Sequence, residues 1–188
     1  MLMPEGVAID SITGAVSPAT GRYTKRLSEL RELFQDRDMA DKEVERLQDP
    51  VVYEIAEYRK PGSDIFFGTT TMSPGRVGRE YYMTRGHFHE RQDAAEVYYT
   101  QHGEGILLLE LRDEQSMTVE MRPGLCAFIP PGWAHRSINT GSEKLIFVWM
   151  CNVAVGHDYG DILKRGMRKL VVARNQLPEL IDNPSWGH

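Results

Sequence analysis

The feature that most constrains this chain is the run GLCAFIPPGWAHRSIN at residues 124–139. Its glycines, proline, histidine and asparagine stand at fixed intervals: Gly124, Pro130, Gly132, His135 and Asn139. Turn geometry explains the glycines and the proline, because a tight turn needs residues with special backbone freedom or a fixed φ. Such spacing is typical of a metal-bearing β-barrel, and it makes His135 a candidate metal ligand.

A second run, GHFHERQDAAEVYYTQHG at residues 86–103, carries the other candidate ligands. Successive side chains of a strand point to opposite faces, so His87 and His89 should share one face. Glu96 follows seven residues after His89. Imidazoles and a carboxylate suit divalent Fe, Mn, Ni, Co or Zn and leave positions open for water or substrate. With His135, these residues predict a catalytic metal site.

Two other polar residues of this run are expected to lie outside the metal site. Glu90 directly follows His89, so in a continuing strand its side chain should point away from the ligand face. His102 falls in the turn sequence HGEG, and turns lie at the surface.

Composition limits the class of protein. At 188 residues the chain is long enough for one domain and too short for two comfortable ones. A net charge of −5, without a dense Lys/Arg block, argues against a nucleic-acid surface. No apolar stretch approaches the roughly 18 residues of a membrane span, and the start MLMPEGVAID does not have the pattern of a secretory signal. The two cysteines sit in apolar stretches and suggest buried thiols, not a disulfide framework. We therefore expect a cytoplasmic protein that binds neither nucleic acid nor membrane.

The chain changes character near residue 50. Before it, apolar residues recur at helical spacing: Leu27, Leu30, Leu33 and Phe34. After it, short strand-like runs alternate with turn sequences such as PGS, SPGR, RPG and NTGSE. This density of strands predicts an all-β sandwich or barrel. We expect one domain over 1–188, with a helical N-terminal extension at 1–50 packed outside, a barrel at 51–174 and a surface tail at 175–188.

Several segments resemble one branch of a known family. The run TTTMSPGRVGREYYMTRGHFHERQDAAEVYYTQHGEG, with DPVVYE, GHDYG and DNPSW, looks like the cupin-type phosphoglucose isomerases of archaea and some bacteria. The resemblance implies a cupin fold, which is a double-stranded β-helix or jelly-roll barrel, and a homodimer. It also implies one divalent metal, iron in several members, and interconversion of glucose 6-phosphate with fructose 6-phosphate, a step of glycolysis and gluconeogenesis.

The resemblance also assigns residues by matching positions. The implied metal ligands are His87, His89, Glu96 and His135. The implied surround of the sugar phosphate comprises Tyr53, Thr70, Thr84 and Gly86, with Tyr98, His157 and Tyr159 near the sugar. This chain departs from the family at one place, because Cys151 stands where relatives have a tyrosine. A phenol contact to the substrate there must be absent or replaced.

The chemistry of an aldose–ketose isomerase leaves some roles open. Strand alternation makes Thr70 face opposite to both Thr69 and Thr71, so only one set can line the barrel. The proton carrier is Glu96, His157 or Tyr159, unless a hydride shift makes a base unnecessary. Two other functions fit the same ligand set: an iron-dependent cupin dioxygenase, which would consume oxygen, and a non-catalytic sugar-phosphate-binding cupin.

Overall fold

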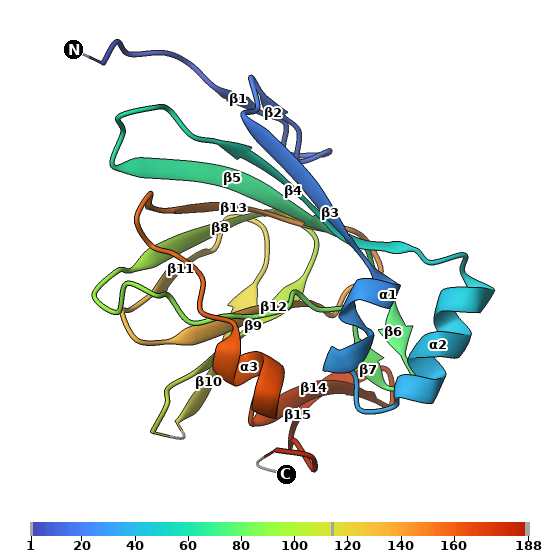
Figure 1. Cartoon of the computed structure of the whole chain (residues 1–188). Helices are drawn as coiled ribbons and strands as arrows, with labels where there is room; N and C mark the ends of the chain where they lie inside the picture. The colour runs from blue at the N-terminus through green and yellow to red at the C-terminus, as the bar shows by residue number, and fades with distance from the viewer. Residues whose placement is uncertain (1, 114, 187–188) are drawn as a thin grey trace.

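The computed structural model describes residues 2–113 and 115–186, and most of its regular structure is β-strand (Figure 1). The strands are β1 (Ala8–Ile9), β2 (Val16–Ser17), β3 (Gly21–Arg26), β4 (Val51–Tyr58), β5 (Ile65–Met72), β6 (Arg76–Val77), β7 (Glu80–Tyr81), β8 (Glu96–His102), β9 (Gly105–Glu110), β10 (Ser116–Met121), β11 (Cys126–Ile129), β12 (Ala134–Asn139), β13 (Leu145–Asn152), β14 (Lys169–Arg174) and β15 (Leu177–Asp182). The helices are α1 (Leu27–Leu30), the 3₁₀ turn η1 (Arg31–Leu33), α2 (Arg37–Arg46) and α3 (Gly160–Arg165).

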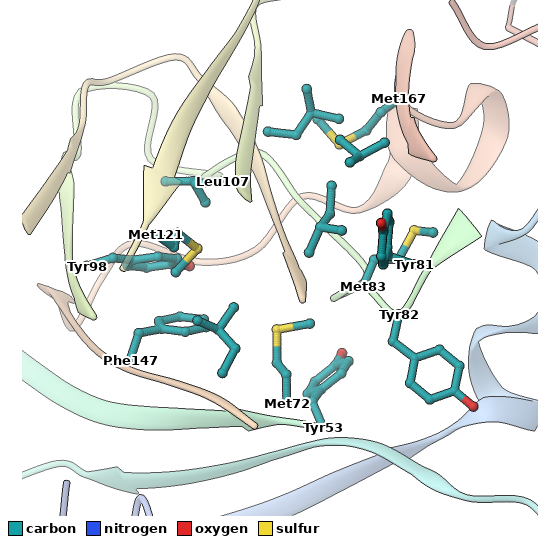
Figure 2. Packing of buried hydrophobic residues seen from close by; sticks show 14 of the residues in the cluster. Tyr53, Met72, Tyr81, Tyr82, Met83, Tyr98, Leu107, Met121, Phe147 and Met167 are labelled. Carbon is teal, nitrogen blue, oxygen red and sulfur yellow. The ribbon is translucent and has the colours of Figure 1, made fainter. Parts of the chain in front are cut away.

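Two sheets form the body of the barrel. A six-stranded sheet has the order β11-β8-β13-β5-β4-β3, and a three-stranded sheet has the order β10-β9-β12. Figure 2 shows side chains of both meeting in the interior, where Tyr98 and Phe147 lie near Leu107 and Met121. A four-stranded sheet of order β15-β14-β7-β6 continues the body beyond β12. The predicted all-β cupin-type barrel is confirmed.

The N-terminal extension is helical only in part. Leu27 and Leu30 are buried in α1, and the Asp36 side chain caps α2 by accepting a hydrogen bond from the Met39 N–H at 2.8 Å. The helices lie beside the barrel (Figure 1). Residues 21–26, however, form β3, which pairs antiparallel with β4. The prediction of a helical extension over residues 1–50 is wrong at residues 21–26. The leucines that follow at helical spacing favoured a helix where the chain forms a short strand.

The expected C-terminal tail is also a strand over much of its length. Asn175 and Gln176 both have positive φ, 51° and 67°, the backbone of a two-residue hairpin turn. This turn returns β15 antiparallel along β14. Residues 187–188, the end of the expected tail, lie outside the described residues. Within the described ranges, no helix is long and apolar enough to cross a membrane.

Candidate active site

Four candidate ligands converge inside the barrel. His87 and His89 lie on the extended segment between β7 and β8, Glu96 begins β8, and His135 lies on β12. One ligand atom from each lies within 4.8 Å of the others. Two remote segments of the chain therefore meet at one point, in reach of a single ion.

Two ligand atoms of this cluster lack a hydrogen-bond partner of their own. The Nε2 atoms of His87 and His135 are buried without a hydrogen bond among the described residues. Glu96 Oε2 lies 3.2 Å from His89 Nε2 and 3.1 Å from His135 Nε2. Buried polar groups without partners cost free energy, which a cation between them would offset. The residues present thus fit a divalent metal.

Backbone carbonyls orient two of the imidazoles. His89 Nδ1 lies 3.0 Å from the Ala94 carbonyl oxygen, so an Nδ1–H donating there leaves the Nε2 lone pair directed at the cluster. His135 Nδ1 lies 3.4 Å from the Trp133 carbonyl oxygen in a weaker version of the same arrangement. Both contacts select the tautomer that a metal ligand needs.

Electrostatics keeps two of the ligands, His87 and Glu96, in their metal-binding protonation states. Burial and the neighbouring imidazoles hold the pKa of His87 well below its usual value, so this ring is neutral at pH 7. Burial alone would raise the pKa of Glu96, but the imidazoles of His135 and His89 outweigh it and lower that pKa to about 2. A neutral imidazole and an ionised carboxylate are the forms that bind cations.

A bulge shapes the wall beside the cluster. Met83 pairs with Ile138 and His87 with His135, so four steps along one segment face three steps along β12. The extra residue falls at Gly86, whose φ is +76°. A Cβ there would meet the His135 carbonyl oxygen at 3.3 Å. Because the bulge changes the alternation, residues three apart in the chain can face the same cavity.

The cluster opens into a cavity. It is lined by Tyr23, Lys25, Tyr53, Ile55, Glu57, Arg59, Phe66, Thr70, Thr84, Arg85, Gly86, His87, Glu96, Tyr98, His135, Phe147, Trp149, Cys151, His157 and Tyr159. Every sequence-predicted site residue is in this lining except His89, which belongs to the ligand cluster. Thr70 faces the cavity, whereas the Thr69 and Thr71 hydroxyls donate to carbonyls of residues 14 and 13.

The register of the strands shows which lining residues lie at each end of the cavity. Tyr53 pairs with Met72 toward one end of β5, and Cys151 pairs with Phe66 toward the other. Cys151 also pairs with Glu96, so the ligand cluster belongs to the second end. The cavity therefore has a metal end and a polar end around Tyr53.

Two polar groups project toward the ligands from the segment before α3. The rings of His157 and His87 are 4.3 Å apart between centroids and nearly perpendicular, and Tyr159 is 5.7 Å from His87. Burial lowers the pKa of His157 and raises that of Tyr159. At pH 7 the imidazole is therefore neutral and the phenol protonated. The Phe88–Asp158 β-bridge holds this segment beside the ligands.

Several lining residues were missed from the sequence. Tyr23 and Lys25 come from β3, which was expected to be helical; their alternation in GRYTKR is the signal that could have found them. Glu57 and Arg59 extend the alternation of β4 beyond Tyr53. The two residues expected to lie apart do so: Glu90 is absent from the lining, and His102 is partly exposed beside Glu143.

Fold and site together define a class of protein, a cupin-type barrel with three histidines and one glutamate gathered around a metal position. The family profile described as "Glucose-6-phosphate isomerase (GPI)" matches residues 24–186. The chain therefore belongs to the glucose-6-phosphate isomerase family, and the resemblance seen in its motifs is confirmed.

Individual relatives agree over nearly the whole chain. The glucose-6-phosphate isomerase of Pyrococcus horikoshii is 40% identical over 97% of this chain and 97% of its own length. That of Thermococcus onnurineus is 41% identical over 97% and 96%. A putative glucose-6-phosphate isomerase 1 of Rhizobium meliloti is 39% identical over 97% and 87%. Among solved structures, an oxalate oxidase aligns with 59% of this chain and 56% of its own at 17% identity and a TM-score of 0.49.

Proposed function

We propose that this protein interconverts glucose 6-phosphate and fructose 6-phosphate as a metal-dependent isomerase. The observation that carries the proposal is a single cavity that has the four-residue ligand cluster at one end and cationic side chains at its polar end. The chain that forms this cavity belongs to the glucose-6-phosphate isomerase family. The same family membership favours an isomerase over the dioxygenase and over the non-catalytic sugar-phosphate binder.

His87, His89, Glu96 and His135 would hold the ion, with Fe²⁺ proposed as the native metal and Mn²⁺, Ni²⁺, Co²⁺ or Zn²⁺ as substitutes. A bound divalent ion supplies Lewis acidity, which stabilises negative charge on the sugar's oxygens during isomerisation. The protein's own part is to bring three imidazoles and one ionised carboxylate together around that position.

The polar end would bind the phosphate. Thr84 Oγ1 accepts the Ser137 N–H at 3.0 Å, so its hydroxyl hydrogen remains free to donate to an anion. Gly86 has no side chain to screen its backbone, and Thr70 and Tyr53 add hydroxyl groups to the same wall. Lys25 and Arg85 supply the positive charge that a dianion requires.

The carbon chemistry would take place between Tyr98, His157 and Tyr159. Glu96 is committed to the ligand cluster, and its low pKa makes it a weak base. We therefore assign proton acceptance to His157, which burial keeps neutral, and proton donation to the Tyr159 phenol. Tyr98 stacks on Phe147 with ring centroids 4.7 Å apart, which fixes its position against the sugar.

Isomerisation in D₂O separates this route from a hydride shift. We expect deuterium on the product carbon that receives the proton, because a side-chain base exchanges its proton with solvent. Mass spectrometry of the recovered hexose phosphate measures it. Product that carries no carbon-bound deuterium after many turnovers would contradict the assignment of His157 as a base.

The central test is a fructose 6-phosphate isomerisation assay on chelator-stripped protein that is refilled with each divalent ion in turn. We expect the stripped protein to lose nearly all activity, and Fe²⁺ to restore the most. Activity that survives with metal below about 0.05 ions per chain by elemental analysis would contradict a metal-dependent reaction. Oxygen uptake with the sugar phosphate would instead support the dioxygenase.

We further propose that the protein works in the cytoplasm as a homodimer. An exposed apolar patch on the outer face of the six-stranded sheet supports the dimer. Phe128 pairs with Val97 and Val97 with Met150 across adjacent strands, so the three side chains form one row. Phe128 is 63% exposed, and Tyr99 and Met150 are each 41% exposed. Monomers rarely expose such contiguous apolar surface. Cys126 shares this face and is exposed, which corrects the expectation that it is buried.

Replacing Phe128 with aspartate should convert the dimer into a monomer, because a dimer would bury this charge without a partner. Analytical ultracentrifugation measures the mass. Leu177→Asp is the matched control, since Leu177 is 69% exposed on β15, away from the patch. A Phe128→Asp protein that remains a dimer at micromolar concentration would exclude this face as the interface.

A further inference from the structure

The bulge beside the ligand cluster leaves one carbonyl without a strand partner. On either side of it the ladder is regular: the Thr84 N–H donates to the Ser137 carbonyl at 2.9 Å, and the His135 N–H donates to the His87 carbonyl at 3.1 Å. Between them the Arg85 carbonyl accepts from the Arg136 guanidinium, from Nη2 at 2.7 Å and from Nε at 3.3 Å. A side chain thus replaces the missing ladder bond.

Arg136 is an unusual residue for this position. It is only 2% exposed, although burying a guanidinium is costly unless charges and hydrogen bonds compensate. Two buried carboxylates, Glu80 on β7 and Glu110 on β9, provide the favourable charge. Neither forms an ion pair with Arg136 within 4 Å among the described residues, and both hydrogen bonds that the Arg136 side chain makes to the described residues go to the Arg85 carbonyl.

Arg136 affects the cavity through the backbone that it contacts. Arg136 follows the ligand His135 on β12, and its Cβ and Nε would lie 3.2 Å from any Cβ placed at Gly86. The Arg136 side chain therefore packs directly against the Arg85–Gly86 peptide. The same peptide presents the Arg85 side chain and the Gly86 backbone to the polar end of the cavity.

We propose that Arg136 is a positioning residue that fixes the Arg85–Gly86 bulge and thereby sets the affinity of the cavity for the phosphate of its substrate. It touches no substrate itself. The inference rests on the proposed function for the identity of the substrate, but its effect is on binding. Loss of the two hydrogen bonds should leave the metal ligands in place and let the bulge relax, so that Thr84, Arg85 and Gly86 no longer converge on one anion.

Two variants test this role. Arg136→Lys keeps the positive charge between Glu80 and Glu110 but cannot donate in a fork. Arg136→Ala removes the group, and a second cavity that Arg136 lines gives free guanidinium ion a path to the vacated position. Lys164→Ala is the matched control, because Lys164 lines that second cavity without contacting the bulge.

The readouts are the Kd of fructose 6-phosphate on metal-free protein by calorimetry, KM and kcat of the refilled enzyme, and metal content. For Arg136→Lys we expect Kd and KM to rise about tenfold or more, kcat to change less than about threefold and metal content to stay constant. Millimolar guanidinium should lower the Kd of Arg136→Ala, and Lys164→Ala should bind like the wild type.

The proposal is overturned if Arg136→Lys binds fructose 6-phosphate within about twofold of the wild type. It is also overturned if folded Arg136→Ala loses metal and phosphate binding together and guanidinium restores neither. If Arg136→Ala does not fold, Arg136→Lys decides. A wild type that binds fructose 6-phosphate without isomerising it refutes the proposed function alone, since the Kd comparison still tests Arg136. A wild type that binds no sugar phosphate refutes both.

Discussion

Replacing His135 with alanine is expected to abolish metal binding and isomerase activity together. His135 is 2% exposed, and its Nε2 has no hydrogen bond among the described residues, so its lone pair is directed into the ligand cluster. Its removal leaves two imidazoles and a carboxylate at the metal position, one ligand fewer than in the wild type. Since a Lewis-acid metal contributes several kcal/mol to such a reaction, we expect activity to fall by about a thousandfold or more. Elemental analysis and the isomerisation assay measure the two losses.

The control is His102→Ala, which changes the same residue type at the surface. The His102 side chain is 40% exposed and pairs with Glu143 at 3.1 Å. Exposed ion pairs contribute about 0–1 kcal/mol, so metal content and activity should both remain near those of the wild type. Equal losses in the two variants would mean that the metal lies elsewhere. A His135→Ala protein that retains stoichiometric metal would remove His135 from the ligand set.

The parts of this fold that could be predicted are those that local patterns determine. Strands such as β4, β5 and β13 are eight-residue runs rich in β-branched and aromatic side chains, and the turns between strands carry glycine or proline. The candidate ligands could be found because histidines at short spacing and the turn before His135 are both visible in the sequence. These ligands converge because the barrel closes and brings their segments together.

The parts that were missed depend on partners remote in sequence. β3 is a strand because the edge of β4 offers it hydrogen-bond partners, whereas the alternation in GRYTKR is short and is followed directly by leucines at helical spacing. β15 forms because Asn175 and Gln176 adopt a hairpin turn that neither residue type requires. The bulge at Gly86 is invisible in the sequence for the same reason, since its extra residue exists only relative to β12.

The second large effect is expected from a substitution at this bulge. Gly86→Ala is expected to reduce isomerase activity by about a hundredfold, the scale of a misplacement of about 1 Å at a reacting site. A left-handed φ of +76° costs an L-residue about 1 kcal/mol or more. The added Cβ would also lie 3.2 Å from Arg136 Nε and 3.3 Å from the His135 carbonyl oxygen, and both residues are buried. The segment must shift, and His87 follows directly after it.

Gly124→Ala separates strain from displacement. Gly124 has a φ of +85°, yet a Cβ there meets nothing within 4 Å. Both variants pay the conformational cost, which thermal unfolding measures as a similar loss of stability. Only Gly86→Ala presses on the wall between the phosphate end and the ligand cluster, so only it should lose substrate affinity and turnover. If both variants lose stability equally and both keep full activity, the bulge does not position the substrate. If Gly124→Ala loses as much activity as Gly86→Ala, general strain is the cause, and the backbone at Gly86 has no special place in the chemistry.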